Sequence, residues 1–167
     1  MKKITEANLN NAYAGESMAH MRYSIYSDVA EQEGLPNVSR LFRAIAFAEK
    51  VHATNHYREL RNIGESPRNL QIAIDGETFE VEEMYPSYRA VAELQGEKGA
   101  LRSTDWALQA EKIHAAMYRN AREATLRGQD VTLGTVHICQ VCGHTVEGEA
   151  PDQCPVCQSL KDKFRAF

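Results

Sequence analysis

Two short segments decide the fold of this chain: Ala48-Glu49-Lys50-Val51-His52 and Ala110-Glu111-Lys112-Ile113-His114. Each holds a Glu-x-x-His motif, and residues three apart lie on one face of an α-helix. Apolar residues such as Ile45 and Met117 flank both motifs, which predicts that the Glu and His side chains face a helix-packed interior. One such motif is common by chance, whereas two at matching positions of an internal repeat are informative.

The repeat extends well beyond the two motifs. The matched pairs are Gly34 with Gly96, Glu49 with Glu111, Gly15-Glu16 with Gly76-Glu77, and Tyr23 with Tyr85. Such self-similarity predicts two helical hairpins related by an approximate twofold axis, and therefore a mainly α fold.

The two halves of the repeat differ in two ways. The second half has one more residue than the first between the matched glutamate and the matched tyrosine. Because Pro86 follows directly, this insertion predicts a kink or a π-bulge near the site. The second half also carries Glu80 where the first half has Ala19, so one hairpin offers an additional carboxylate.

Residues 5–128 are rich in helix formers, with apolar residues three and four apart. Glycine and proline interrupt this pattern at residues 34–37, 64–69 and 96–99. We expect the first helix to start near Thr5, Asn37 to cap the second helix, and Gly128 to end the helical region. Four helices with a long connection after the second predict a four-helix bundle with a crossover.

Six side chains of the repeat are expected to converge: Glu16, Glu49, His52, Glu77, Glu111 and His114. Several buried carboxylates repel one another, and a multivalent cation removes that repulsion. Oxygen ligands with one imidazole per ion suit iron or manganese, and di-metal four-helix bundles use this ligand set. The alternative is that these residues form ordinary polar pairs on solvated helix faces.

Four further side chains lie near these positions in the sequence. His20 and His56 follow Glu16 and His52 by one helical turn, and we expect surface or structural roles for both. Tyr23 and Tyr85 follow the matched glutamates by about two turns. They could donate hydrogen bonds to ligand carboxylates or pack in the core.

From about residue 131 the character of the sequence changes. Two Cys-x-x-Cys pairs, Cys139 with Cys142 and Cys154 with Cys157, are separated by 11 residues. Two such knuckles can hold one tetrahedral ion in four thiolates, and the spacing does not distinguish zinc from iron. We therefore expect two domains, a helical one at residues 1–130 and a metal-organised one at 134–167.

Composition excludes several classes of function. The chain has 167 residues, a formal charge of −4 and 43% apolar residues. This acidic balance argues against nucleic acid or a membrane surface as partner, and no apolar run is long enough to span a bilayer. Because the N-terminal residues do not resemble a secretory signal, we expect a cytoplasmic protein whose cysteines are reduced.

Several motifs together resemble the rubrerythrin family over essentially the whole chain. They are Tyr13-Ala14-Gly15-Glu16-Ser17, the segment from Gly76 to Pro86, both Glu-x-x-His motifs and the paired Cys-x-x-Cys knuckles. The resemblance implies a ferritin-like four-helix bundle followed by a small rubredoxin-like β/loop domain. It also implies three irons, two at the carboxylate and histidine side chains and one at the four cysteines.

The resemblance further implies a role for each ligand. Glu49 and Glu111 would bridge the two irons, Glu16 would bind the first, and Glu77 with His114 would bind the second. Glu80 and His52 match two ligands that exchange on the first iron, the carboxylate in the diferric form and the histidine in the diferrous form. These two residues are therefore the candidate catalytic residues.

The implied activity is that of a peroxidase, the two-electron reduction of hydrogen peroxide to water in oxidative-stress defence. The cysteine-bound iron would pass electrons from an external donor, such as an NAD(P)H-dependent reductase or a rubredoxin. The chain itself carries no Gly-x-Gly-x-x-Gly fingerprint for a dinucleotide. Family members are typically homodimers, and the connection of about 13 residues after Asn62 is long enough to let subunits exchange helix pairs.

The cysteine knuckles depart from the usual rubredoxin pattern at two places. Gln158 stands where a left-handed backbone normally calls for glycine, at a cost of about 1 kcal/mol. His144 follows Gly143 where tyrosine is usual, and zinc could replace iron at this site during expression.

Two other functions compete with the peroxidase. A ferroxidase or iron-storage protein of ferritin type would use oxygen and would need no cysteine unit. A zinc-ribbon interaction module attached to a helical bundle would leave the buried carboxylates unexplained.

Overall fold

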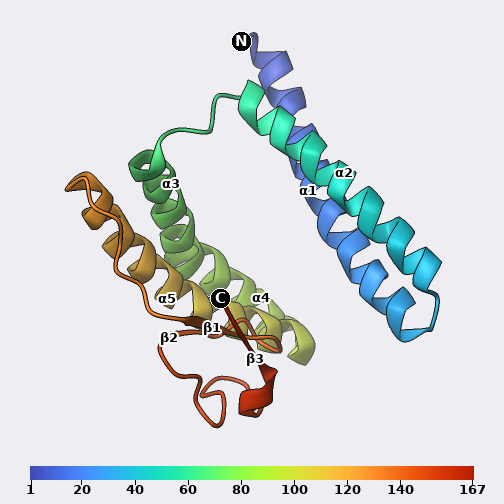
Figure 1. Ribbon diagram of the computed structural model, residues 1–167, viewed down its shortest axis with the longest axis vertical. Coiled ribbons are helices and arrows are strands. Elements are labelled where there is room, and N and C mark those ends of the chain that lie inside the picture. The colour runs from blue at the N-terminus through green and yellow to red at the C-terminus, as the bar shows by residue number, and fades with distance from the viewer. The chain divides into compact units, whose positions relative to one another are not determined.

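The computed structural model describes residues 1–167, which form two compact units, Met1–Gly64 and Glu65–Phe167 (Figure 1). The first unit is a single helical hairpin. The second unit contains another helical hairpin and the cysteine-rich segment. The predicted boundary between residues 130 and 134 therefore falls inside the second unit, and the division into domains 1–130 and 134–167 stays a prediction.

The first unit consists of helices α1 (Lys3–Gln32) and α2 (Pro36–Glu59), which run antiparallel along each other (Figure 1). The residues buried between them are small, which lets two helices approach closely. They are Ser27, Ala30, Ser39, Ala46 and Ala53. The Ser27 and Ser39 hydroxyls lie 3.1 Å apart and satisfy each other in this interface.

Two predicted helix starts in this unit are wrong. The first helix begins at Lys3 rather than near Thr5, and Lys2 occupies its N-cap position. The second begins at Pro36, so Asn37 lies inside the helix and caps nothing. Proline favours this first position because its fixed φ suits a helix and its missing N–H needs no partner there.

The second hairpin pairs a long interrupted helix with a long regular one. Helix α3 (Ser66–Phe79) continues through the π-helix η1 (Glu80–Met84) into α4 (Tyr85–Gln95), and α5 (Lys98–Leu126) packs against all three. The π-helix confirms the bulge predicted from the extra residue and Pro86. Gly96 ends α4 in the left-handed conformation, with φ of +70°, whereas Gly99 lies within α5.

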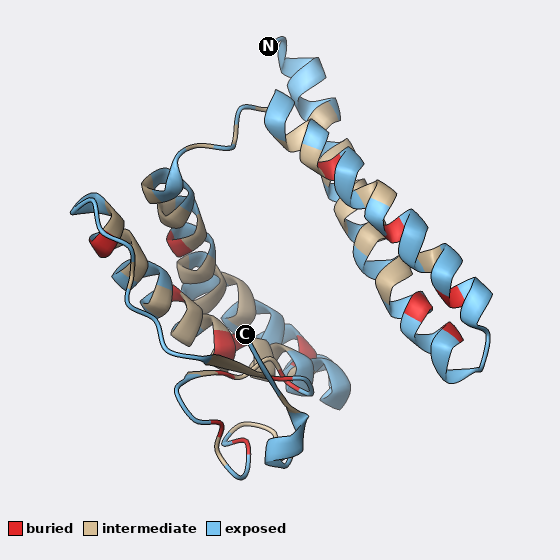
Figure 2. Cartoon of the chain, in the orientation of Figure 1, coloured by how far each residue is buried: buried red, intermediate tan, exposed pale blue.

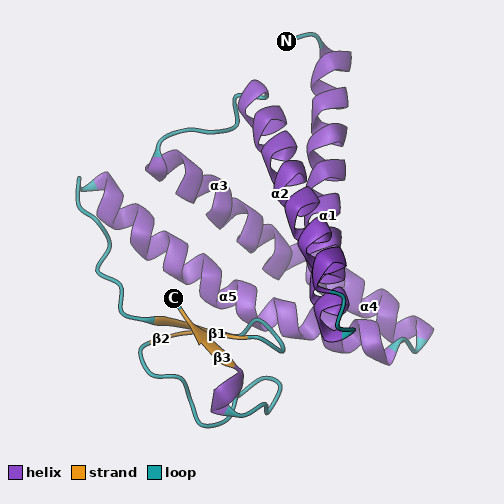
Figure 3. Ribbon diagram, turned by 45° about the vertical axis from the view of Figure 1, so that its right-hand side comes forward, coloured by secondary structure: helices purple, strands orange, loops and turns teal.

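The cysteine-rich segment forms a small antiparallel sheet (Figure 3). Strand β1 (Val136–Cys139) lies between β2 (Thr145–Glu147) and β3 (Phe164–Ala166), and a short 3₁₀-helix, η2 (Lys161–Lys163), precedes β3. Its core consists of buried cysteines packed against Phe164 and against Trp106 of α5. The sheet is thus fixed to the second hairpin through α5.

Buried residues are sparse along both hairpins (Figure 2). Large apolar side chains such as Met21, Leu41 and Phe47 in the first unit are more than half exposed. None of the helices is both long and apolar enough to cross a membrane.

Candidate metal centres

The first hairpin gathers three of the six predicted ligands. Glu16 comes from α1, while Glu49 and His52 lie one turn apart on α2, and each offers a ligand atom within 4.8 Å of the others. His52 Nδ1 lies 2.9 Å from Glu49 Oε2 and 3.9 Å from Glu16 Oε1. The two carboxylates are largely covered, whereas the His52 side chain is 55% exposed.

The second hairpin gathers the other three in the same way. Glu77 comes from α3, and Glu111 and His114 lie one turn apart on α5. His114 Nδ1 lies 2.6 Å from Glu111 Oε2 and 3.9 Å from Glu77 Oε2. The internal repeat of the sequence is therefore a repeat of site geometry, with one Glu-Glu-His group in each unit.

The two largely buried carboxylates of the second group, Glu77 and Glu111, would be stabilised by a bound cation. Glu77 Oε2 is buried and has no hydrogen-bond partner. The pKa of Glu77 is raised to about 7, chiefly by burial and further by the neighbouring Glu111 carboxylate, while His114 opposes the shift. Burial likewise raises the pKa of Glu111. Two carboxylates and an imidazole nitrogen directed at one point form a donor set that fits iron or manganese.

Glu80 lies beside this group without belonging to it. It is the first residue of η1, and its pKa is raised by burial and then by the charge of Glu77, while His114 lowers it. A π-turn advances the helix by one extra residue, so it changes which side chains of α3 and α4 face α5. The insertion thus places a third carboxylate close to Glu77.

The tyrosines behave differently in the two hairpins. Burial and then the charges of Glu80, Glu111 and Glu77 raise the pKa of the Tyr85 phenol. The Tyr23 ring packs 6.2 Å from that of Phe42. Neither hydroxyl bonds to a ligand carboxylate in this structure, and the hydrogen bonds proposed for them stay a prediction.

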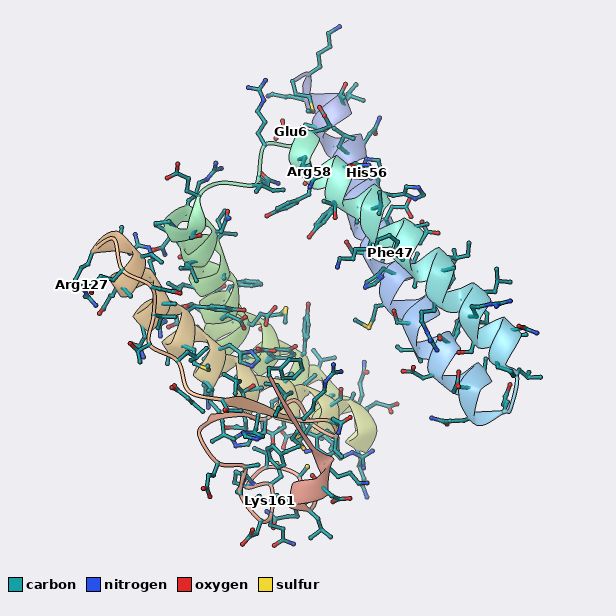
Figure 4. The ribbon with its side chains drawn as sticks, in the orientation of Figure 1. Glu6, Phe47, His56, Arg58, Arg127 and Lys161 are labelled. Atoms are coloured by element: carbon teal, nitrogen blue, oxygen red, sulfur yellow. The ribbon has the colours of Figure 1, made fainter.

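The two other histidines of the first hairpin fall outside both groups. His20 Nδ1 lies 2.8 Å from the carbonyl oxygen of Ala46, which ties α1 to α2 and confirms a structural role. His56 is in the last turn of α2 (Figure 4) and belongs to neither metal-binding group.

The four cysteines form a third group of ligand atoms within 4.8 Å of one another. Cys139 and Cys157 Sγ are 3.6 Å apart, as are Cys142 and Cys154 Sγ, and all four thiols are free. Sulfurs held tetrahedrally about 2.3 Å from one ion would be roughly 3.8 Å apart. The spacing therefore fits a single metal ion.

Hydrogen bonds favour thiolates at two of these cysteines. Burial alone would raise the pKa of Cys139, but bonds from the Ser159 hydroxyl and from the backbone amides of Val141 and Cys142 outweigh it and lower the pKa to about 6. The pKa of Cys157 is lowered in the same way, again chiefly through Ser159. Burial raises the pKa of Cys142, which a bound cation would offset.

Sequence reasoning missed two hydroxyl residues at these centres. Ser159 lies between two sulfurs, and Thr145 Oγ1 is 2.7 Å from His114 Nε2. Only their position in the sequence could have pointed to them, because Thr145 follows Cys142 by three residues and Ser159 follows Cys157 by two. Hydroxyl residues are too common in loops for that signal to predict a contact.

Comparisons with known proteins agree with this geometry. Residues 7–122 match the model of the Rubrerythrin family, and residues 137–165 match that of the "Rubrerythrin, rubredoxin-like domain" family. Rubrerythrin-2 of Clostridium acetobutylicum is 44% identical over 98% of this chain and 97% of its own length. Nigerythrin of Nitratidesulfovibrio vulgaris is 32% identical over 98% and 86%.

A solved structure, described as the fully reduced, all-ferrous state of nigerythrin, aligns with a TM-score of 0.56. That alignment is 30% identical and covers 98% of this chain and 86% of the other. The two family matches confirm the predicted fold class, a mainly α four-helix bundle followed by a small three-stranded, four-cysteine unit.

Proposed function

The chain belongs to the rubrerythrin family, and from this premise we propose that it is a non-haem di-iron peroxidase that reduces hydrogen peroxide to water. The observation that carries the proposal is that one chain contains two matching Glu-Glu-His groups and a four-cysteine group. A structural zinc ribbon accounts for the cysteines but not for the orphaned, buried Glu77 Oε2.

We assign one iron to each Glu-Glu-His group. Glu16, Glu49 and His52 would hold the first iron, and Glu77, Glu111 and His114 the second, with Glu49 and Glu111 shared as bridges. The bound irons would supply two electrons and the positive charge that stabilises the departing oxygens of peroxide.

His52 and Glu80 would exchange as ligands of one iron, and Glu80 would hold a proton when it is not a ligand. Glu80 would take the place of His52 as a ligand of the first iron, as membership of the rubrerythrin family implies. While His52 is the ligand, Glu80 is released, and its raised pKa lets its carboxyl group hold a proton. Glu80 is then a candidate proton donor to the substrate.

The cysteine group would carry the electrons. Four thiolates can hold an iron that changes charge by one, and the family match over residues 137–165 supports that assignment over zinc. Electrons would come from a separate reductase or a rubredoxin. Because the four cysteines are assigned to a metal ion and not to disulfides, we expect a reducing compartment, the cytoplasm. The family resemblance implies a homodimer.

Stopped-flow mixing of the fully reduced protein tests the proposal. We expect hydrogen peroxide to reoxidise the di-iron site at least about tenfold faster than oxygen does at equal concentration. Faster reaction with oxygen would replace the peroxidase by a ferroxidase. Protein grown with abundant iron should contain three irons per chain. Cys154→Ser should remove the visible colour of the cysteine-bound iron and leave the two irons of the Glu-Glu-His groups in place.

A further inference from the structure

Thr145 joins the cysteine unit to the second Glu-Glu-His group. It is the first residue of β2, is 3% exposed, and its Oγ1 lies 2.7 Å from Nε2 of His114 on α5. The same oxygen lies 3.1 Å from the carbonyl oxygen of Gly143, the residue after Cys142. A side chain this buried, with two polar contacts, has a defined arrangement of protons.

Counting protons fixes the direction of both hydrogen bonds. A threonine hydroxyl has one proton, and the Gly143 carbonyl can only accept, so Thr145 donates to Gly143. The Thr145 oxygen must then accept from His114, which places a hydrogen on Nε2. A neutral His114 therefore has its lone pair on Nδ1, the nitrogen that faces Glu111 and Glu77 and that would bind a metal ion.

The first hairpin provides the contrast. His52 Nδ1 faces Glu49 and Glu16 as His114 Nδ1 faces Glu111 and Glu77, but no hydrogen bond holds the far nitrogen of His52. Two histidines that the repeat makes equivalent are thus held very differently.

We propose that Thr145 is a positioning residue that fixes the tautomer and ring orientation of His114 as a metal ligand. The inference rests on the proposed function, because it takes His114 as a metal ligand. It adds a partner that holds His114, a hydroxyl supplied by the cysteine unit. Partners of this kind typically change metal affinity 10–100-fold.

Nuclear magnetic resonance on the full chain, labelled with ¹⁵N-histidine and loaded with zinc as a diamagnetic probe, tests the inference. In the wild type we expect His114 to be protonated at Nε2, with that hydrogen protected from exchange with water. In Thr145→Val the hydrogen should exchange at least about tenfold faster, and chelator competition should show one Glu-Glu-His zinc bound about 10–100-fold more weakly. Thr145→Ser should restore both.

Controls separate positioning from folding. Thr104→Val removes a hydroxyl from the same helix as His114, where it bonds only to the helix backbone, and should change neither reading. Thr145→Ala serves as a second variant without the hydroxyl if the valine variant does not fold. Unchanged exchange and affinity in Val and Ala variants, or no rescue by serine, would overturn the inference. Hydrogen exchange and zinc affinity are measured independently of the iron content and peroxide rates that test the proposed function, so the two proposals can fail separately.

Discussion

Gly143 and Gln158 occupy equivalent positions in the two cysteine knuckles, and both have left-handed backbone, with φ of +78° and +63°. Each amide donates a 2.9 Å hydrogen bond to the carbonyl of the first cysteine of its knuckle, Cys139 or Cys154. A side chain strains this conformation and glycine does not. The two knuckles are therefore alike in geometry but unequal in backbone energy.

Gln158→Gly should stabilise the cysteine unit by about 1 kcal/mol, because it removes that strain and loses only a weak 3.4 Å side-chain contact to Pro155. Gly143→Gln should destabilise it by a similar amount, since a Cβ at Gly143 meets nothing within 4 Å and only the backbone resists. Denaturant unfolding of the zinc-loaded chain measures both. Equal midpoints for the two variants would contradict the account.

Ser159→Ala should weaken the cysteine site most at low pH. The Ser159 hydroxyl lies 3.2 Å from Cys139 Sγ and 3.1 Å from Cys157 Sγ, where it stabilises thiolates. Its loss should raise the pKa of the Cys139 and Cys157 thiols. The variant should therefore bind metal more weakly than the wild type, by a larger factor at pH 6 than at pH 8. Thiolate absorbance and zinc affinity against pH measure this.

Ser87→Ala is the matched control for that change, because Ser87 is exposed and bonds only to the Glu83 carbonyl of its own helix. With iron bound, Ser159→Ala should also lower the reduction potential, since hydrogen bonds to sulfur favour the more reduced ion. A potential and a pH profile equal to those of the control would rule out a role for the hydroxyl.

Glu80→Ala makes the second hairpin resemble the first, which has Ala19 at the matching position. It should slow peroxide turnover at least about tenfold, because it removes both an exchangeable ligand and a proton donor, while the helices remain folded. Rapid-mixing kinetics with circular dichroism measures this. Glu83→Ala lies in the same π-helix at an exposed position and should keep the wild-type rate; equal losses in both variants would assign the effect to the helix itself.

The sequence predicted features that depend on spacing. A period of three to four residues placed Glu49 with His52, and an extra residue before Pro86 predicted the π-helix at Glu80. Helix starts were less predictable, because Asn37 is a good cap by type while the neighbouring Pro36 decides where the helix begins. Contacts such as that of Thr145 with His114 depend on docking between segments 31 residues apart, which no local pattern encodes.

Glu77 gives the metal-free protein a pH dependence that runs opposite to that of most carboxylates. Its pKa is about 7 in the folded chain, chiefly because of burial, whereas an unperturbed glutamate, as in the unfolded chain, has a pKa of 4.5. The folded chain therefore binds a proton that the unfolded chain has lost between these values. This contribution to stability is complete below about pH 4.5 and disappears as the pH rises through about 7.

We expect Glu77→Gln to remove this dependence in metal-free protein, because the amide imitates the protonated carboxyl group. Urea unfolding at pH 5 and pH 8 should show the wild type losing about 1–3 kcal/mol more stability than the variant over that range. Metal-loaded wild type is the control, since a cation takes the place of the proton and should hold its stability at pH 8. Parallel pH profiles for metal-free wild type and Glu77→Gln would show that Glu77 does not keep its proton in the folded chain.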